Sequence, residues 1–176
     1  MDIIEVITAD HDETARLIEE LEHLAADDSR TSEAMRIAAR LAVGLKTHAK
    51  AEERILYESM RTATPQLSEL ALEGPYEHQA LDLMLDKLAV HRPGPELRAI
   101  LHVLKAQFEH HARIEEEQIM LPAVRLAFLD EERAQLARDF LDVKQRLQPQ
   151  IERLVGAPAR GTHDGRVSFH IHGHRR

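Results

Sequence analysis

Residues 41–56, LAVGLKTHAKAEERIL, decide the fold class of this chain. Their leucine and isoleucine residues recur at helical spacing and form an apolar stripe along one side of a helix. His48 and Glu52 stand four residues apart on the same side, one turn above each other. A buried carboxylate without a partner is very costly, and a bound cation is one partner that removes this cost. The segment therefore predicts a helix that carries metal ligands into an apolar core.

The same pattern occurs a second time, in the sequence HARIEE that starts at His111. His111 and Glu115 have the four-residue spacing of the first pair, and Leu104, Phe108 and Ile119 supply the apolar flanks. A single His-x-x-x-Glu pair on a helix is usually a surface ion pair. Two such pairs on apolar faces favour a metal site instead.

A lone histidine precedes each pair by one predicted helix, His11 in the first half of the chain and His78 in the second. When neighbouring helices run antiparallel, counting residues from each turn brings these histidines close to the height of the pairs. Four imidazoles and two carboxylates are then expected to converge inside one bundle. The six predicted metal ligands are His11, His48, Glu52, His78, His111 and Glu115.

The composition of the whole chain favours an all-α protein. Glycine and proline occur only 7 times each among 176 residues, and aromatic residues make up 3%. Alanine, leucine, glutamate and arginine, all strong helix formers, dominate the rest. Apolar periodicity and the positions of proline predict five helices, which span residues 2–26, 32–61, 66–89 with a break at Gly74-Pro75, 95–128 and 130–154.

Short connections between long helices predict an up-down-up-down four-helix bundle over residues 1–128. Residues 129–155 are expected to form an additional C-terminal helix packed on the bundle. Residues 156–176, rich in Gly, Pro, Arg and His, are expected to be a disordered tail. The tail contains His163 and the sequence FHIHGH at 169–174, a loose metal-binding tract for which a role in metal acquisition is the alternative interpretation.

Charge and composition exclude several classes of protein. A net charge of −8 argues against a nucleic-acid or anionic-membrane surface. The absence of cysteine excludes disulfides, iron–sulfur clusters and cysteine-type zinc sites. No apolar run approaches the roughly 20 residues that span a bilayer. The acidic N-terminus lacks the pattern of a secretion signal, so a cytoplasmic location is expected.

The number of predicted ligands favours two metal ions. Four imidazoles and two bridging carboxylates leave some coordination positions of two octahedral ions free. An oxo or hydroxo bridge would take part of these, and a small exogenous ligand the rest. Ligation by nitrogen and oxygen alone favours iron, with manganese or zinc as less favoured choices. The expected cofactor is therefore a pair of iron ions, and the expected partner is a small diatomic or peroxide ligand.

These motifs resemble the hemerythrin-like family, also described as the HHE cation-binding domain, over roughly residues 1–125. The matching elements are Asp10-His11, His48-x-x-x-Glu52-Glu53, Glu77-His78 and His111-x-x-x-Glu115-Glu116. The resemblance implies a non-haem di-iron centre. Its terminal ligands would be His11, His48, His78 and His111, and its bridging carboxylates Glu52 and Glu115.

The chain departs from the oxygen-carrying members of this family. Those proteins have His-x-x-x-His on the third helix and His-x-x-x-x-Asp on the fourth. Here Asp82 follows His78 after four residues, and Glu116 follows His111 after five. The chain is therefore more similar to members linked to oxygen, nitric oxide, peroxide or iron handling than to simple oxygen carriers. The sequence leaves open whether a further ligand comes from Asp82, Glu116, Tyr57 or Tyr76.

Three functions remain distinguishable by experiment. The first is a di-iron protein that binds or turns over oxygen, nitric oxide or peroxide; turnover would make it an enzyme. The second is an iron or redox sensor, or an iron store, without turnover. The third is a plain helical bundle that binds no metal.

Overall fold

The computed structural model describes residues 1–156, and all of its regular elements are helices. The predicted tail lies outside the described residues except for Gly156. The elements are α1 (Ile3–Leu24), η1 (Asp28–Arg30), α2 (Thr31–Glu52), η2 (Glu53–Tyr57), α3 (Glu58–Ala63), α4 (Pro65–Leu70), α5 (Gly74–Leu88), α6 (Pro95–Phe108), η3 (Glu109–Met120), α7 (Leu121–Ala127) and α8 (Asp130–Val155).

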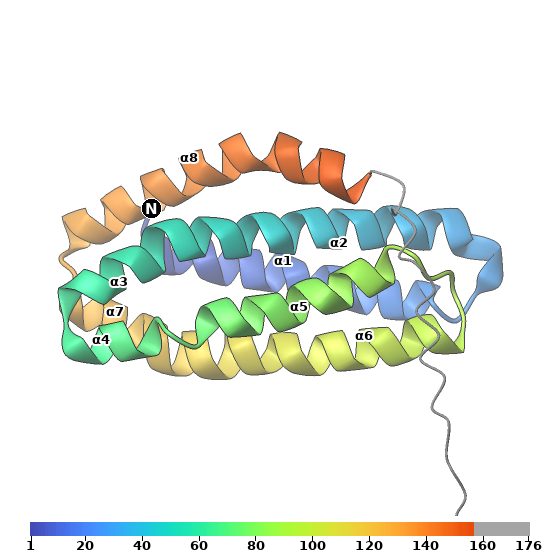
Figure 1. Cartoon of the computed structure of the whole chain (residues 1–176), viewed down its shortest axis with the longest axis horizontal. Coiled ribbons are helices and arrows are strands. Elements are labelled where there is room, and N and C mark those ends of the chain that lie inside the picture. The colour runs from blue at the N-terminus through green and yellow to red at the C-terminus, as the bar shows by residue number, and fades with distance from the viewer. Residues whose placement is uncertain (157–176) are drawn as a thin grey trace, which may run out of the picture.

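Nine of these elements, all except η1 and α8, form four antiparallel rods (Figure 1). The rods are α1; α2 with η2 and α3; α4 with α5; and α6 with η3 and α7. The segments η2 and η3 are π-helical turns within otherwise continuous helices, so they alter the register of the side chains without ending the rods. The predicted all-α up-down-up-down bundle is confirmed.

Local sequence explains the starts of three helices, α1, α4 and α5. Asp2 caps α1 in a capping box with Glu5. The Thr64 side chain accepts the backbone N–H of Leu67, and Pro65 occupies the first turn of α4. The predicted break at Gly74-Pro75 is the start of α5, where the proline needs no hydrogen-bond partner for its nitrogen.

The core consists of two apolar clusters, and each rod of the bundle contributes to both. Along α1, Ile3 and Ile7 belong to one cluster and Leu17 and Leu21 to the other, with His11 between them. The other three rods repeat this order, with a polar layer between two apolar segments. The bundle therefore places a layer of buried polar side chains between two apolar ends.

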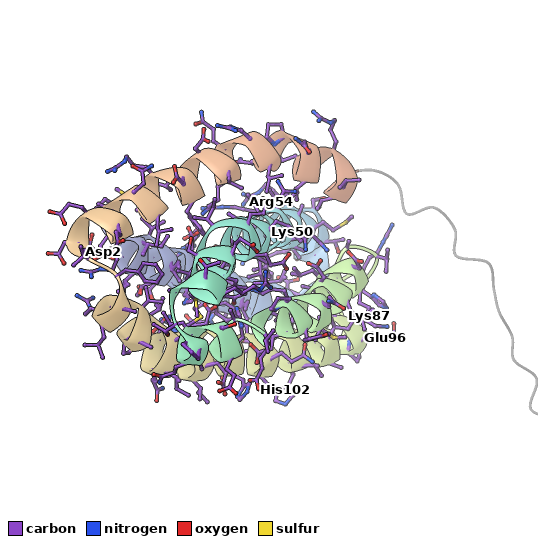
Figure 2. The ribbon with its side chains drawn as sticks, turned by 60° about the vertical axis from the view of Figure 1, so that its left-hand side comes forward. Asp2, Lys50, Arg54, Lys87, Glu96 and His102 are labelled. Carbon is purple, nitrogen blue, oxygen red and sulfur yellow. The ribbon has the colours of Figure 1, made fainter. Side chains whose placement is uncertain are left out.

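The last helix, α8, lies along the outside of α1 and α2 (Figure 1). Its first turn is attached to the start of α1, because the buried Arg133 guanidinium lies 2.8 Å from an Asp2 carboxylate oxygen. Figure 2 shows Asp2 beside this end of α8. Arg133 also donates to the Phe128 carbonyl at 2.6 Å. No helix among residues 1–156 is both long and apolar enough to cross a membrane.

Candidate metal centre

The polar layer contains six histidine and glutamate side chains, each no more than 2% exposed. One histidine comes from each of the four rods. One carboxylate comes from α2 and one from η3. These residues are His11, His48, Glu52, His78, His111 and Glu116.

The six side chains form two groups of three, each with ligand atoms within 4.8 Å of one another. One group is His11, His48 and Glu116, and the other is Glu52, His78 and His111. The His78 and His111 Nε2 atoms lie 3.2 Å apart, and the His11 and His48 ring centroids 5.1 Å apart.

Each carboxylate contacts a histidine of both groups. One Glu52 oxygen lies 3.4 Å from His48 Nε2 and 3.5 Å from His78 Nε2. Glu116 Oε2 lies 3.0 Å from His11 Nε2, and Glu116 Oε1 lies 3.8 Å from His111 Nε2. Both carboxylates therefore lie where they can bridge two ions, one in each group.

Several atoms at the centre of this layer have no hydrogen-bond partner among residues 1–156. They are His11 Nε2, His48 Nε2, Glu52 Oε1 and Glu116 Oε2. Buried polar atoms rarely remain unsatisfied, because each costs free energy when it is removed from water without a partner. Converging nitrogen and oxygen lone pairs are what a transition-metal ion requires. The residues present therefore fit metal ions.

The Nδ1 atom of every histidine in the cluster is held by a carboxylate outside it. Because an ionised carboxylate only accepts hydrogen bonds, each Nδ1–H is the donor, and in the neutral form of each imidazole the Nε2 atom carries the lone pair. The four pairs, with their nitrogen–oxygen distances, are His11–Glu117 at 2.9 Å, His48–Asp10 at 2.9 Å, His78–Glu53 at 3.1 Å and His111–Glu77 at 2.8 Å.

These four carboxylate partners are sequence neighbours of the clustered residues. Asp10 precedes His11 but holds His48 on the next rod, and Glu53 follows Glu52 but holds a histidine on α5. Glu77 on α5 holds His111 on η3, and Glu117 on η3 holds His11 on α1. Each rod therefore holds a histidine of the next, and the four contacts form a closed ring around the bundle. Adjacent residues on a helix point in different directions, so a ligand that points inward has a neighbour that points toward the next rod.

Nearby carboxylates favour the protonated form of two of these imidazoles, those of His48 and His78, when no metal is bound. Burial opposes a charge on His48, but the Glu52 and Asp10 carboxylates outweigh it and raise its pKa to about 10. Burial likewise opposes a charge on His78, and hydrogen bonds to Glu52 and Glu53 raise its pKa to about 9. For Glu52, burial is outweighed by the two histidines, which hold its pKa well below its usual value. Metal ions must therefore displace protons from these imidazoles.

Tyr57, left open by the sequence, reaches the cluster. Its hydroxyl donates to Glu116 at 2.6 Å and lies 3.4 Å from a Glu52 oxygen, and its ring stacks on His78 at 5.7 Å. Burial and the two nearby carboxylates raise the Tyr57 pKa well above its usual value, so the phenol stays protonated. The π-turn η2 explains its position, because Tyr57 follows Glu52 by five residues.

Gly74 makes room for this tyrosine. A Cβ atom at Gly74 would lie 2.3 Å from the Tyr57 hydroxyl oxygen. A cavity of about 20 Å³ adjoins both residues and is also lined by Glu116 and Met120. This volume admits one water-sized molecule.

The predicted ligand Glu115 lies outside the cluster, and Glu116 occupies its place. The Glu115 side chain is 30% exposed and lies 3.4 Å from the exposed His110. The same one-residue displacement appears further along, where Ile119, predicted to face the core, is 45% exposed and Met120 is buried.

The physical reason is the π-helical segment η3, which includes both His111 and Glu116. In a π-turn the residue five positions later, rather than four, returns to the same face. The sequence contained an indication of this register, since the five-residue spacing from His111 to Glu116 matches the His-x-x-x-x-Asp of oxygen-carrying hemerythrins.

The other residues left open do not reach the cluster. Asp82 is 38% exposed and lies 3.2 Å from Lys46 Nζ. Tyr76 is 73% exposed. Asp82 belongs to neither of the two groups among residues 1–156 that could hold a metal.

A comparison with protein families gives the same assignment. The model of the hemerythrin HHE cation-binding domain matches residues 2–124. The chain belongs to the hemerythrin family. Searches among curated proteins and among solved structures gave no match. The hemerythrin domain is a cation-binding module, and all six clustered side chains lie within its matched residues. The helix α8 begins at Asp130, after the matched region ends.

Proposed function

We propose that this hemerythrin-family protein is a non-haem di-iron protein that binds or reacts with oxygen, nitric oxide or peroxide. One ion would be held by His11 and His48 and the other by His78 and His111. Glu52 and Glu116 would bridge them, because each carboxylate contacts a histidine of both groups. This contact pattern is the observation that carries the proposal.

Ligand chemistry supports iron as the bound metal. Imidazole and carboxylate ligands suit iron and manganese. Two histidines and two bridging carboxylates would give each ion four protein ligands, which fills the coordination of a four-coordinate zinc but leaves positions open on a six-coordinate iron. Two iron ions, with the oxo or hydroxo bridge that coordination counting predicts, would supply the redox chemistry. Six protein side chains also leave positions on the ions for a small exogenous ligand.

The surroundings of the cluster favour a very small ligand. The cavity beside Tyr57 and Glu116 has about 20 Å³, so on this side of the cluster there is room for a molecule the size of water and none for an organic substrate. The Tyr57 hydroxyl is held protonated at this cavity and donates to Glu116. To donate to a ligand that enters there, the hydroxyl would turn its single proton away from Glu116.

Metal analysis of untagged protein from iron-supplemented culture tests the proposal. We expect about two irons per chain and a near-ultraviolet absorption that changes on reduction and on exposure to nitric oxide or peroxide. Protein that folds normally but contains no iron and takes up none when ferrous iron is added would overturn the proposal.

A second candidate function is an iron or redox sensor, or an iron store, without turnover. The observation that favours a sensor is the attachment of α8 to the carboxylate partner of His48, described below. Iron that is held stoichiometrically, with no consumption of peroxide or nitric oxide and with α8 protected from proteolysis only when iron is bound, would favour this alternative.

A further inference from the structure

Each carboxylate in the ring that holds the histidines also contacts a positively charged or titratable nitrogen. Such a contact restricts the carboxylate and compensates part of its charge. The four contacts are Glu53 with Lys50 at 2.8 Å, Glu117 with Arg113 at 2.5 Å, Glu77 with His110 at 3.7 Å, and Asp10 with Lys144.

Three of these four partners belong to the bundle itself. Lys50 lies one helical turn from Glu53, and Arg113 one turn from its own partner Glu117. Lys144 differs, because it lies on α8, beyond the residues matched by the family model. One of the four contacts that hold the carboxylates therefore comes from a helix outside the region matched by the hemerythrin model.

Lys144 acts on the same oxygen that holds His48. Asp10 Oδ2 accepts the His48 Nδ1–H at 2.9 Å and also pairs with Lys144 Nζ. Both Asp10 and Lys144 are about three-quarters covered by other residues. An oxygen held between two donors has a fixed position, and it fixes the plane of the imidazole in turn.

A second residue of α8 contacts the same histidine. The fully buried Phe140 ring lies edge-on to the His48 ring at 5.6 Å, and Lys144 Nζ lies 5.6 Å from the Phe140 ring centroid. Phe140 and Lys144 are four residues apart and so lie on one face of α8. This face thus packs on the ring of His48 and on its hydrogen-bond partner together.

A groove of about 510 Å³ between α8 and the bundle brings solvent close to this contact. Its lining includes Asp10, His48 and Lys144, with Gly44 on the α2 side. Without the lysine, water in this groove would compete for Asp10, and the carboxylate would lose its second anchor.

We propose that Lys144 is a positioning residue for the metal centre, which holds Asp10 so that His48 Nε2 faces the ion bound with His11 and Glu116. This inference rests on the proposed metal binding. It assigns a function to α8, namely that docking of this helix and occupancy of one of the two metal positions stabilise each other. Because binding coupling is reciprocal, metal in this position holds α8 on the bundle.

The test compares Lys144→Met with Lys144→Arg in the full iron-loaded chain. We expect Lys144→Met to release one iron per chain to a ferrous chelator about 10-fold faster or more, within the range typical of outer partners of metal ligands. The second iron should be released at the unsubstituted rate. Lys144→Arg should restore slow release, since its guanidinium can replace the ammonium at Asp10.

Arg146→Met is the matched control on the same helix, because Arg146 is exposed and its guanidinium pairs, among residues 1–156, only with Asp142. It should leave iron release unchanged. A merely structural role of Lys144 would lower the melting temperature of the iron-free and iron-loaded proteins equally and would not distinguish the two ions. If Lys144→Met fails to fold, Lys144→Gln is measured in the same way.

The outcomes separate this inference from the proposed function. An unsubstituted chain that binds no iron contradicts the di-iron proposal. An unsubstituted chain that holds two irons, together with folded Lys144→Met that releases both at the normal rate, overturns the role of Lys144 alone.

Discussion

The two halves of the bundle contain nearly the same sequence motif but use it in different registers. In the first half, His48 and Glu52 lie within the regular helix α2, and the π-turn follows them. In the second half, η3 includes both clustered side chains, and the carboxylate that lies in the cluster is Glu116, five residues after His111. The two halves nevertheless place their side chains in one layer. A metal site therefore constrains positions in space, whereas spacing in the sequence follows the local helix type.

The largest expected effect is on iron content, when the buried carboxylate of the second half is replaced by an amide. Glu116→Gln removes the negative charge and replaces one carboxylate oxygen of the cluster with an amide nitrogen, so we expect iron content to fall from about two per chain to one or fewer. Glu115→Gln, at the adjacent and partly exposed position, should retain full iron content. Metal analysis of both variants checks this, and iron loss confined to Glu115→Gln would show that both halves use the same four-residue register.

The pH dependence of stability tests a property that both halves share, a buried histidine whose pKa is raised by nearby carboxylates. His48 and His78 have pKa values raised from 6.5 to about 10 and about 9. Their protonation stabilises the metal-free fold fully below the unfolded pKa near 6.5, and this contribution is lost as pH rises through about 9 to 10. Metal-free protein should therefore become less stable to denaturant across this window.

Iron-loaded protein is the control for that measurement. Its imidazoles bind metal in their neutral form, so its free energy of unfolding should change much less over the same pH range. A metal-free protein whose stability is constant or increases between about pH 6.5 and 10 would contradict the assignment of protons to these histidines.

A pair of glycine substitutions tests the hydrogen bond from Tyr57 in the first half to Glu116 in the second. Gly74→Ala forces the Tyr57 ring away from Glu116, because its new methyl group would lie 2.3 Å from the hydroxyl oxygen. We expect it to lower the free energy of unfolding by about 1–3 kcal/mol, the usual cost of overpacking. Gly44→Ala meets no atom within 4 Å and should be neutral or stabilising by up to about 1 kcal/mol. Chemical denaturation should therefore show a loss of stability for Gly74→Ala and none for Gly44→Ala.

The smallest effect is expected at Asp82, which follows His78 at the spacing of a second ligand in oxygen carriers. Its carboxylate pairs with Lys46 at the surface instead. Asp82→Asn should leave the iron content unchanged and alter stability by no more than about 1 kcal/mol, as is usual for an exposed ion pair. Iron analysis and denaturation check both expectations, and loss of iron would place Asp82 among the ligands.

The sequence by itself determined the all-helical class, the order of the rods and the convergence of His11, His48, Glu52, His78 and His111. These features follow from apolar periodicity and helix length, which are local properties that every residue along a rod reinforces. Comparable local information predicted the break at Gly74-Pro75, since proline restricts the backbone wherever it occurs.

Tertiary structure decided the choice of Glu116 over Glu115, the approach of Tyr57 and the contact of Lys144 with Asp10. A π-turn shifts the register by one residue, and an expectation based on α-helical spacing therefore places the wrong carboxylate in the core. The Lys144 contact joins residues 134 positions apart in the sequence, so no periodicity within either helix predicts it. Such contacts are selected by the packing of whole helices against one another, which only the folded chain specifies.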